Sequence, residues 1–246
     1  LANQHQKDEW LNKLINGEMQ STLAFTEPQS RFQLNDVATT ANKKEGNFIL
    51  NGKKSFVLNG SESDLIIVPA RTSGSQTDVK GITLFAVKKD SAGIEMNSYK
   101  SVDGRSAAEI KLNNVSVSSD SIIGEIDNGY DALEATVDEA TLAICAEATG
   151  IMKSLHDKTV EYSKNRVQFG IPIGGFQALQ HRMVDTLMAC EETESILLWA
   201  ITTEQDDKSA LKKAISGLKY QIGTAVKHVG QEAVQLHGGM GISWEL

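Results

Sequence analysis

The sequence is poor in cysteine, in long apolar runs and in positive charge, and each shortage excludes a class of protein. Only two cysteines occur, Cys145 and Cys190, and both lie among apolar neighbours in helical patterns. We therefore expect two reduced core thiols rather than a disulfide framework or a metal site. No run approaches the roughly 18 apolar residues of a membrane span. The formal net charge of -8 argues against a nucleic-acid-binding protein, which usually carries a basic patch.

The N-terminal residues Leu1-Ala2-Asn3-Gln4 show no charged leader followed by an apolar core, which is the pattern of a secretory signal. Together with the reduced thiols, this favours a cytoplasmic location, with the mitochondrial matrix as the alternative for a eukaryotic protein. The histidines show no paired ligand spacing, so no metal site is predicted. Because the chain starts on leucine and stops directly after a glycine-rich turn, we expect a fragment of a longer protein.

The first half of the chain predicts a short helical segment followed by a β domain. Residues 8–20 have a helical apolar stripe, with Asp8 as the expected cap and Gly17 as the stop, so residues 1–21 are predicted to end an N-terminal helical domain. Short apolar runs punctuated by Gly and Asn follow, without a helical period, and predict an antiparallel barrel or sandwich over residues 22–124. The expected strands are 21–26, 53–58 between Asn51-Gly52 and Asn59-Gly60 turns, 65–70, 81–87, 93–96, 108–112 and 115–123.

After a predicted hinge at Asp127-Asn128-Gly129, the pattern is helical to the end. The periodicity predicts helices over 130–165, 176–204 and 208–237, the last capped by Asp206 or Asp207. Long helices with short connections indicate an antiparallel bundle of the four-helix type, truncated, over residues 125–246. The predicted fold class is therefore α+β, with a β domain followed by a helical bundle.

The link between the first two long helices carries more polar residues than a turn requires. It reads Arg166-Val-Gln168-Phe169-Gly-Ile-Pro-Ile-Gly-Gly-Phe176-Gln177. Glycine and proline alone would suffice to connect two helices. The arginine and the glutamine that ends the link therefore indicate that this segment holds something.

Four segments, taken together, resemble the flavin-dependent acyl-CoA dehydrogenases. They are Phe25-Thr26-Glu27-Pro28, Gly52 to Gly60, the link from Arg166 to Gln177, and Gln235 to Gly241. They span the chain and keep the family's order and separations. The resemblance implies that the chain lacks most of the family's N-terminal helical domain and its last helices.

The resemblance implies an FAD-dependent oxidoreductase that converts an acyl-CoA thioester to the trans-2-enoyl-CoA. In the family, a carboxylate removes the Cα proton while flavin N5 accepts the Cβ hydride, and hydrogen bonds polarise the thioester carbonyl. The implied partners are acyl-CoA, an electron-transfer flavoprotein or similar acceptor, and further copies of the chain in a dimer or homotetramer, with a heteromer as another possibility. The implied process is fatty acid metabolism.

The implied flavin-binding residues come from all four segments. Phe25 and Thr26 match a strand end beside the flavin ring; an ordinary strand end is the alternative. Phe56, Val57 and Leu58 match a segment that covers the flavin face, although Leu58 lacks the family's hydroxyl. The arginine fork suits a pyrophosphate, and glycines allow close backbone approach. The residues matching the adenosine-diphosphate side are Arg166, Gln168, Phe169, Phe176, Gln177, Gln235, Gly238 and Gly239.

The implied substrate-binding residues depart from the family pattern. Arg31 and Phe32 stand in a loop where many members have small residues, and Arg31 could bind a CoA phosphate or a charged acyl end. Asp138 matches a residue that holds CoA, whereas Thr141 replaces a frequent arginine. These departures leave open an acyl-CoA oxidase, a base-lacking subunit of a heteromeric dehydrogenase, or a non-enzymatic adaptor.

The catalytic base is not identified by the sequence. In most members it lies on a loop beyond the present C-terminus, so a glutamate after Leu246 is expected. In a minority it lies on the first long helix, at the position that aligns with Ala140. Glu139 is adjacent but about 100° around the helix, and Glu147 lies on nearly the same face as Ala140. Both remain candidates.

Overall fold

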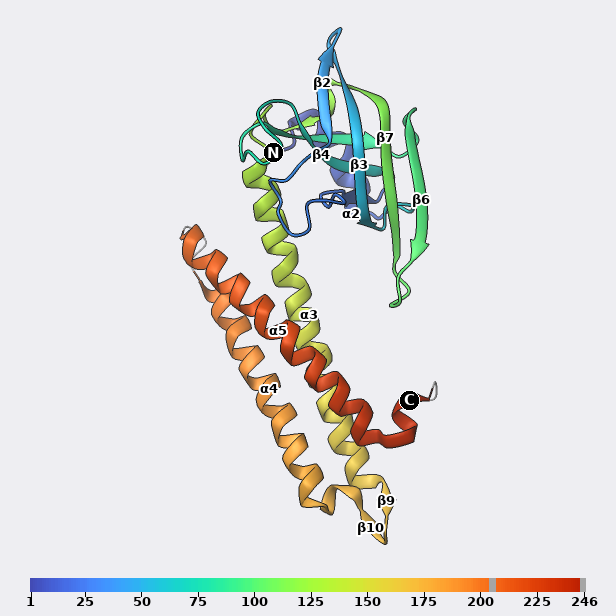
Figure 1. Cartoon of the computed structure of the whole chain (residues 1–246), viewed down its shortest axis with the longest axis vertical. Coiled ribbons are helices and arrows are strands. Elements are labelled where there is room, and N and C mark those ends of the chain that lie inside the picture. The colour runs from blue at the N-terminus through green and yellow to red at the C-terminus, as the bar shows by residue number, and fades with distance from the viewer. Residues whose placement is uncertain (204–206, 244–246) are drawn as a thin grey trace. The chain divides into compact units, whose positions relative to one another are not determined.

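The computed structural model describes residues 1–203 and 207–243 (Figure 1). It divides between Ala135 and Thr136 into two compact units. The first unit holds a β-sheet and the second holds long helices, as predicted. The division falls inside the first long helix rather than at the predicted boundary between residues 124 and 125.

The sheet of the first unit is mixed rather than wholly antiparallel. Its strands follow the order β6-β7-β3-β2-β4-β5-β8, with β1 beside β4. Most neighbours are antiparallel, but β1 pairs with β4 in parallel, as Ser21 does with Leu65. The strands are β1 Ser21–Leu23, β2 Thr40–Lys44, β3 Asn47–Leu58, β4 Leu65–Arg71, β5 Ile82–Lys88, β6 Ile94–Lys100, β7 Ser106–Ser118 and β8 Ile122–Ile123.

The core of this unit comes from the inward faces of the strands. In β3 the buried positions alternate, whereas β4 and β5 are buried almost throughout. Phe48 and Phe85 meet at its centre with ring centroids 5.3 Å apart. Burying each side chain of this size stabilises the fold by about 1.5–3 kcal/mol.

The predicted turn at Asn51-Gly52 is wrong, because both residues lie inside β3. The strand pairing with β7 shifts register between Leu50 and Gly52. A Cβ atom at Gly52 would lie 2.7 Å from the Cα of Thr39, so glycine is needed here for close backbone approach rather than for a turn. The turn before β3 is instead made by Glu45 and Gly46, whose φ angles are +50° and +87°.

The helical segment at the N-terminus begins earlier than predicted. It comprises α1 Gln4–Gln6, the π-helical turn η1 Lys7–Leu11 and α2 Asn12–Ile15. Asn3, not Asp8, is the cap, in a capping box with Gln6. The buried Gln6 amide also donates to the carbonyls of Asp120 and Ile122 at 2.7 and 2.8 Å. These bonds fasten the segment to the end of the sheet.

The predicted hinge is a fixed connection to the sheet. Gly129 N–H donates to the Ile82 carbonyl at 2.7 Å. The Asp127 carboxylate accepts the hydroxyl groups of Thr72 and Ser73 at 2.6 and 2.8 Å. The start of the first long helix is therefore anchored within the first unit.

The predicted helices are confirmed to within two residues wherever the structure describes them. They are α3 Tyr130–Asn165, α4 Gln177–Thr202 and α5 Lys208–His237 (Figure 1). Asp207 caps α5 by accepting from Ala210 N–H at 3.0 Å. Glu204 and Asp206 lie outside the described residues.

The three long helices share two buried clusters. Cys145 of α3 lies in one with Leu197 and Leu218, and Cys190 of α4 lies in the other with Met152. Both cysteines are buried and free, which confirms their predicted role as core thiols. Over residues 1–203 and 207–243, no helix has the length and apolar character that crossing a bilayer requires.

A buried ion pair lies under the loop that follows Phe25-Thr26. Glu27 Oε1 and Lys54 Nζ are 2.7 Å apart, and their side chains are 1% and 0% exposed. Lys54 also donates to the Pro69 carbonyl at 2.7 Å. The Glu27 carboxylate accepts the N–H groups of Ala38 and Thr39 at 2.8 and 3.2 Å. Both charges are thus compensated by groups of the protein itself.

Acidification should weaken the β domain through Glu27. Burial acts to raise the pKa of Glu27, but the charge of Lys54 and several hydrogen bonds outweigh it and hold that pKa below its ordinary 4.5. Its contribution to stability is therefore complete above the unfolded-state pKa and is lost as the pH falls through the folded-state pKa. We expect the urea midpoint of the wild-type protein to decrease as the pH is lowered from about 5 to about 3, and to decrease more steeply than that of Glu27→Gln/Lys54→Met. The same pH dependence in both proteins would contradict this role.

Candidate ligand-binding sites

The link between α3 and α4 is a tight hairpin. Strands β9 Val167–Gln168 and β10 Ile171–Pro172 are antiparallel, and the 3-10 turn η3 Ile173–Gly175 follows. The two turn residues, Phe169 and Gly170, have φ angles of +53° and +84°, as a two-residue hairpin of type I′ requires. A phenylalanine in this conformation is unusual. Its side chain is also 93% exposed, so this strained residue is presented at the surface, as is common where a ligand or partner binds.

An open hollow of about 460 Å³ lies in the helical unit beside this hairpin. The ends of α3 and α5, the hairpin and the first turns of α4 contribute to it. Six of its side chains, those of Tyr162, Arg166, Gln168, Arg182, Gln235 and His237, can donate hydrogen bonds. The lining residues are Tyr162, Arg166, Gln168, Ile173, Leu179, Arg182, Gln235, Leu236, His237, Gly238, Gly239 and Met240.

Two glycines leave the backbone open to the hollow. Gly238 has φ +63°, and its N–H caps α5 by donating to the Gln235 carbonyl. A Cβ atom at Gly238 or Gly239 would meet no atom within 4 Å. The open space at both positions lets a ligand approach the main chain closely. The cap at Gly238 therefore leaves the main chain of this segment uncovered.

Three polar residues of the hollow, Tyr162, Arg182 and His237, were not identified from the sequence. His237 is buried, its Nδ1 lies 2.7 Å from the Ala233 carbonyl oxygen, and its ring lies against Tyr162 with centroids 4.3 Å apart. Arg182 Nε donates to Glu232 at 2.6 Å. That bond raises the pKa of Arg182 and lowers the pKa of Glu232. Only His237 carried a sequence signal, since it lies inside the Gln235 to Gly241 segment.

The electrostatics of the hollow favour an anion. Arg166 and Arg182 bring two guanidinium groups to it, of which that of Arg182 is paired with the Glu232 carboxylate. The N-terminus of α4, from which Leu179 and Arg182 line the hollow, has no side-chain cap. Helix N-termini carry partial positive charge and free N–H groups that suit phosphates. The arrangement therefore fits a ligand with phosphate groups.

Not every predicted residue of the link reaches the hollow. Phe169 and Phe176 contact each other edge to face with centroids 6.2 Å apart, and Gln177 is exposed at the start of α4. None of these three lines the hollow. They form the outer side of the link, where a second molecule could reach them.

The predicted residues of the β domain also lie together. Strand β1 ends at Leu23 rather than at the predicted Thr26, and Ser55 N–H donates to the Thr26 carbonyl at 2.9 Å, which joins the segment after β1 that contains Phe25 to β3. Phe56 and Leu58 are 49% and 45% exposed, whereas Val57 is 2% exposed in the core. The Val57 side chain therefore cannot contact a ligand, and its main chain pairs with Ala108 of β7.

The loop after Pro28 presents two predicted substrate residues to solvent. Arg31 has φ +49° and Phe32 is 99% exposed. Ser30, just before them, is buried and bonds Glu27 through main chain and hydroxyl. The base of the loop is thus fixed while Arg31 and Phe32 project from it.

The remaining predicted residues lie on α3 in the second unit. Asp138 is half-buried, and the Thr141 hydroxyl donates to the Val137 carbonyl at 2.7 Å. Glu139 and Glu147 are exposed. None of the four lines the hollow.

The sequence and the fold match one family of known proteins. The model of the acyl-CoA dehydrogenase middle domain matches residues 22–115, and that of the acyl-CoA dehydrogenase C-terminal domain matches residues 127–246. Together they cover most of the chain. The chain belongs to the acyl-CoA dehydrogenase family, a family of oxidoreductases.

Individual relatives agree with this assignment. A 3-(aryl)acrylate reductase of Clostridium sporogenes is 32% identical over 96% of this chain and 63% of its own length. The structure of butyryl-CoA dehydrogenase from Megasphaera elsdenii is 29% identical, with a TM-score of 0.90 over 99% of this chain and 64% of that one. An FAD complex of PigA is 26% identical, with a TM-score of 0.92 over 99% and 64%. The chain thus spans slightly less than two thirds of these proteins.

Proposed function

We propose that this chain forms the greater part of an FAD-dependent acyl-CoA dehydrogenase. The observation that carries the proposal is the hollow between the hairpin and the end of α5. It combines two guanidinium groups, two glutamine amides and an open glycine backbone. A diphosphate suits the arginines and the uncapped start of α4, so the residues present fit the adenosine-diphosphate side of FAD.

The flavin side of the cofactor belongs to the β domain in this proposal. Bound FAD would supply the hydride acceptor for the reaction. Thr26 and the main chain at Val57 and Leu58 would orient the ring through hydrogen bonds. The exposed ring of Phe56 would cover it and exclude water. Arg31, Phe32, Asp138 and Thr141 would contact the acyl-CoA substrate, and the base would be a glutamate after Leu246.

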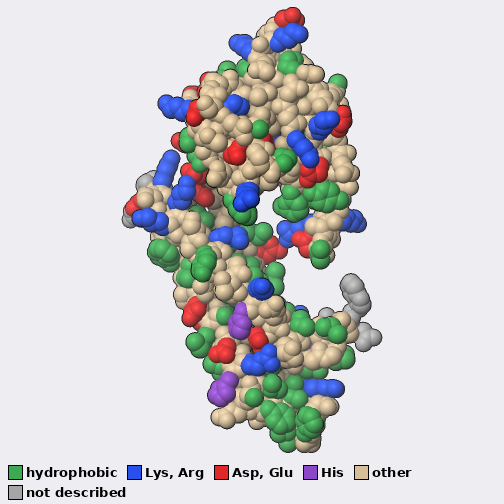
Figure 2. Space-filling model, viewed as in Figure 1, with side chains coloured by type: hydrophobic (Ala, Val, Ile, Leu, Met, Phe, Trp, Pro, Cys, Tyr) green, Lys and Arg blue, Asp and Glu red, His purple; other side chains and the backbone are tan. Residues whose placement is uncertain are grey.

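The proposal includes an oligomer, because in the family the link clamps the FAD of a neighbouring subunit. Exposed apolar side chains on α4 support a second copy as partner, among them Leu187 at 42%, Met188 at 54%, Leu198 at 55% and Trp199 at 52% exposure. Figure 2 shows hydrophobic side chains at the surface of this unit. Apolar surface of this extent commonly marks an interface. The proposed assembly is a homodimer or homotetramer, with a heteromer as the alternative. The proposed electron acceptor is an electron-transfer flavoprotein.

The test is an anaerobic titration of the complete, purified polypeptide with acyl-CoA thioesters. We expect a visible flavin band that bleaches on addition of a substrate and returns when an acceptor is added. A protein without bound flavin would contradict the proposal. Rapid return of the band in oxygen alone would identify an oxidase, and a stable band that no thioester bleaches would identify a base-lacking subunit.

A further inference from the structure

Glu109 of β7 lies opposite a bulge in β3. Lys54 pairs with Ile110 and Val57 pairs with Ala108. The two residues between them on β3, Ser55 and Phe56, therefore face the single residue Glu109. A bulge of this kind leaves N–H groups of the longer strand without partners in the ladder.

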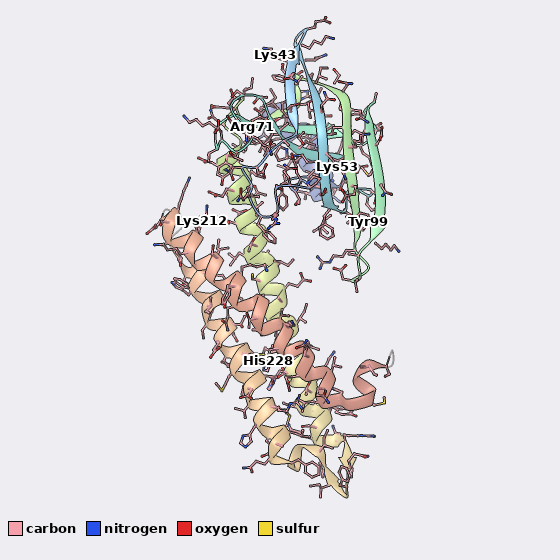
Figure 3. The ribbon with its side chains drawn as sticks, in the orientation of Figure 1. Lys43, Lys53, Arg71, Tyr99, Lys212 and His228 are labelled. Atoms are coloured by element: carbon pink, nitrogen blue, oxygen red, sulfur yellow. The ribbon has the colours of Figure 1, made fainter. Side chains whose placement is uncertain are left out.

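The Glu109 carboxylate accepts hydrogen bonds from both bulge residues. Its Oε1 accepts the Phe56 N–H at 3.1 Å, and its Oε2 accepts the Ser55 hydroxyl at 3.0 Å. Tyr99 of β6 donates to Oε1 at 3.2 Å, and Lys53 Nζ lies 3.3 Å from Oε2. Lys53 and Tyr99 are labelled in Figure 3 and come from the strands on either side of β7. Both carboxylate oxygens are thus engaged.

These bonds hold a residue that is otherwise strained. Phe56 has φ +49°, the left-handed conformation that a bulky side chain rarely adopts. Its ring is nevertheless half exposed rather than packed in the core, so core packing does not explain the conformation. The Glu109 carboxylate that accepts the Phe56 N–H explains the conformation, because hydrogen bonds to a carboxylate are stronger than those between neutral groups.

We infer that Glu109 is a positioning residue that fixes the Ser55–Phe56 bulge, and with it the exposed Phe56 ring, in the shape that receives the flavin. The inference rests on the proposed function. Because Ser55 N–H also donates to Thr26, the bulge joins the two flavin-facing segments of the β domain. The pKa of Glu109 supports this role: burial acts to raise it, but the bonds from Phe56, Ser55, Lys53 and Tyr99 lower it, so the carboxylate stays charged at neutral pH.

The first test compares FAD binding and the flavin absorption and circular dichroism bands in three variants of the complete polypeptide. Glu109→Ala should bind FAD about tenfold more weakly and shift both bands. Glu109→Gln should lie between wild type and Glu109→Ala, because its amide can still accept from Phe56 but lacks the charge that strengthens this bond and that pairs with Lys53. Glu95→Ala is the matched control, since Glu95 is an exposed carboxylate on β6 that contacts Lys111 and Asn113 instead.

The second test is a double-mutant cycle on the thermal midpoint, with Phe56→Gly as the partner change. Glycine adopts the left-handed conformation without strain. Removing Glu109 should therefore lower the midpoint less in the Phe56→Gly background than in wild type. This readout does not depend on flavin.

The outcomes separate the inference from the proposed function. A wild-type protein without flavin would contradict the proposed function. The double-mutant cycle would still measure whether Glu109 stabilises the conformation of Phe56. Flavin affinity and bands unchanged in Glu109→Ala would overturn the inference. If Glu109→Ala aggregates, recovery of Glu109→Ala/Phe56→Gly as folded protein supports the inference, and aggregation of both overturns it.

Discussion

Replacing Lys54 by methionine should destabilise the protein by about 3–5 kcal/mol. The substitution shortens the side chain by one atom and leaves the Glu27 carboxylate buried without its cation. The 2.7 Å ion pair and the bond to the Pro69 carbonyl are both lost. Urea unfolding at pH 7, followed by far-ultraviolet circular dichroism, measures the change.

Two variants show whether the buried charge is the cause. Lys53→Met alters the neighbouring lysine of β3, whose side chain is 53% exposed, and should cost no more than about 1 kcal/mol. Glu27→Gln/Lys54→Met removes both charges and should be more stable than Lys54→Met alone. A Lys54→Met protein as stable as Lys53→Met would refute the role given to the pair.

Replacing Arg166 by alanine should weaken FAD binding about 10- to 100-fold, because a charge-assisted bond to phosphate contributes ~1.5–3 kcal/mol. Arg166 is exposed at the end of α3, so its removal leaves the helix cores intact. Arg166→Lys should be intermediate, since lysine keeps the charge but loses the planar fork. The amount of flavin retained per polypeptide after gel filtration ranks the three proteins, wild type, Arg166→Lys and Arg166→Ala, by their affinity for FAD.

The matched control for Arg166 is Lys164→Ala. Lys164 is an exposed cation in the same last turn of α3 and does not line the hollow. It should retain flavin like wild type. Equal losses from Lys164→Ala and Arg166→Ala would show that general charge, rather than the hollow, holds the cofactor.

The long helices could be predicted because their signals are local and agree. A helical period, the glycines of the link and the cap at Asp207 define α3 to α5 within the sequence itself. The β domain was harder. Strand β2 reads Thr-Ala-Asn-Lys-Lys and has little apolar pattern. It forms a strand because it pairs with β3, which follows it directly, and with the more distant β4. The Asn51-Gly52 dipeptide favours a turn, but in the structure it lies inside β3, where Gly52 allows the close approach of Thr39.

Some residues of the candidate site could likewise be predicted from local sequence, whereas others could not. Arg166, Gln235 and the glycines after it lie in segments whose residue types indicate a phosphate ligand. Arg182 and Glu109 have no such local signal, since each acquires its role from a contact with a distant strand or helix. Glu109 lies 53 residues from Phe56, so only the strand pairing brings the two together.

The central claim is that the hollow beside the link binds the diphosphate side of FAD. Isothermal titration of the complete apoprotein with FAD, run in parallel for wild type and Arg166→Ala, tests it most directly. We expect saturable binding of FAD by wild type and an affinity at least about tenfold lower for Arg166→Ala. Absence of saturable binding by wild type, or identical affinities for the two proteins, would contradict the claim.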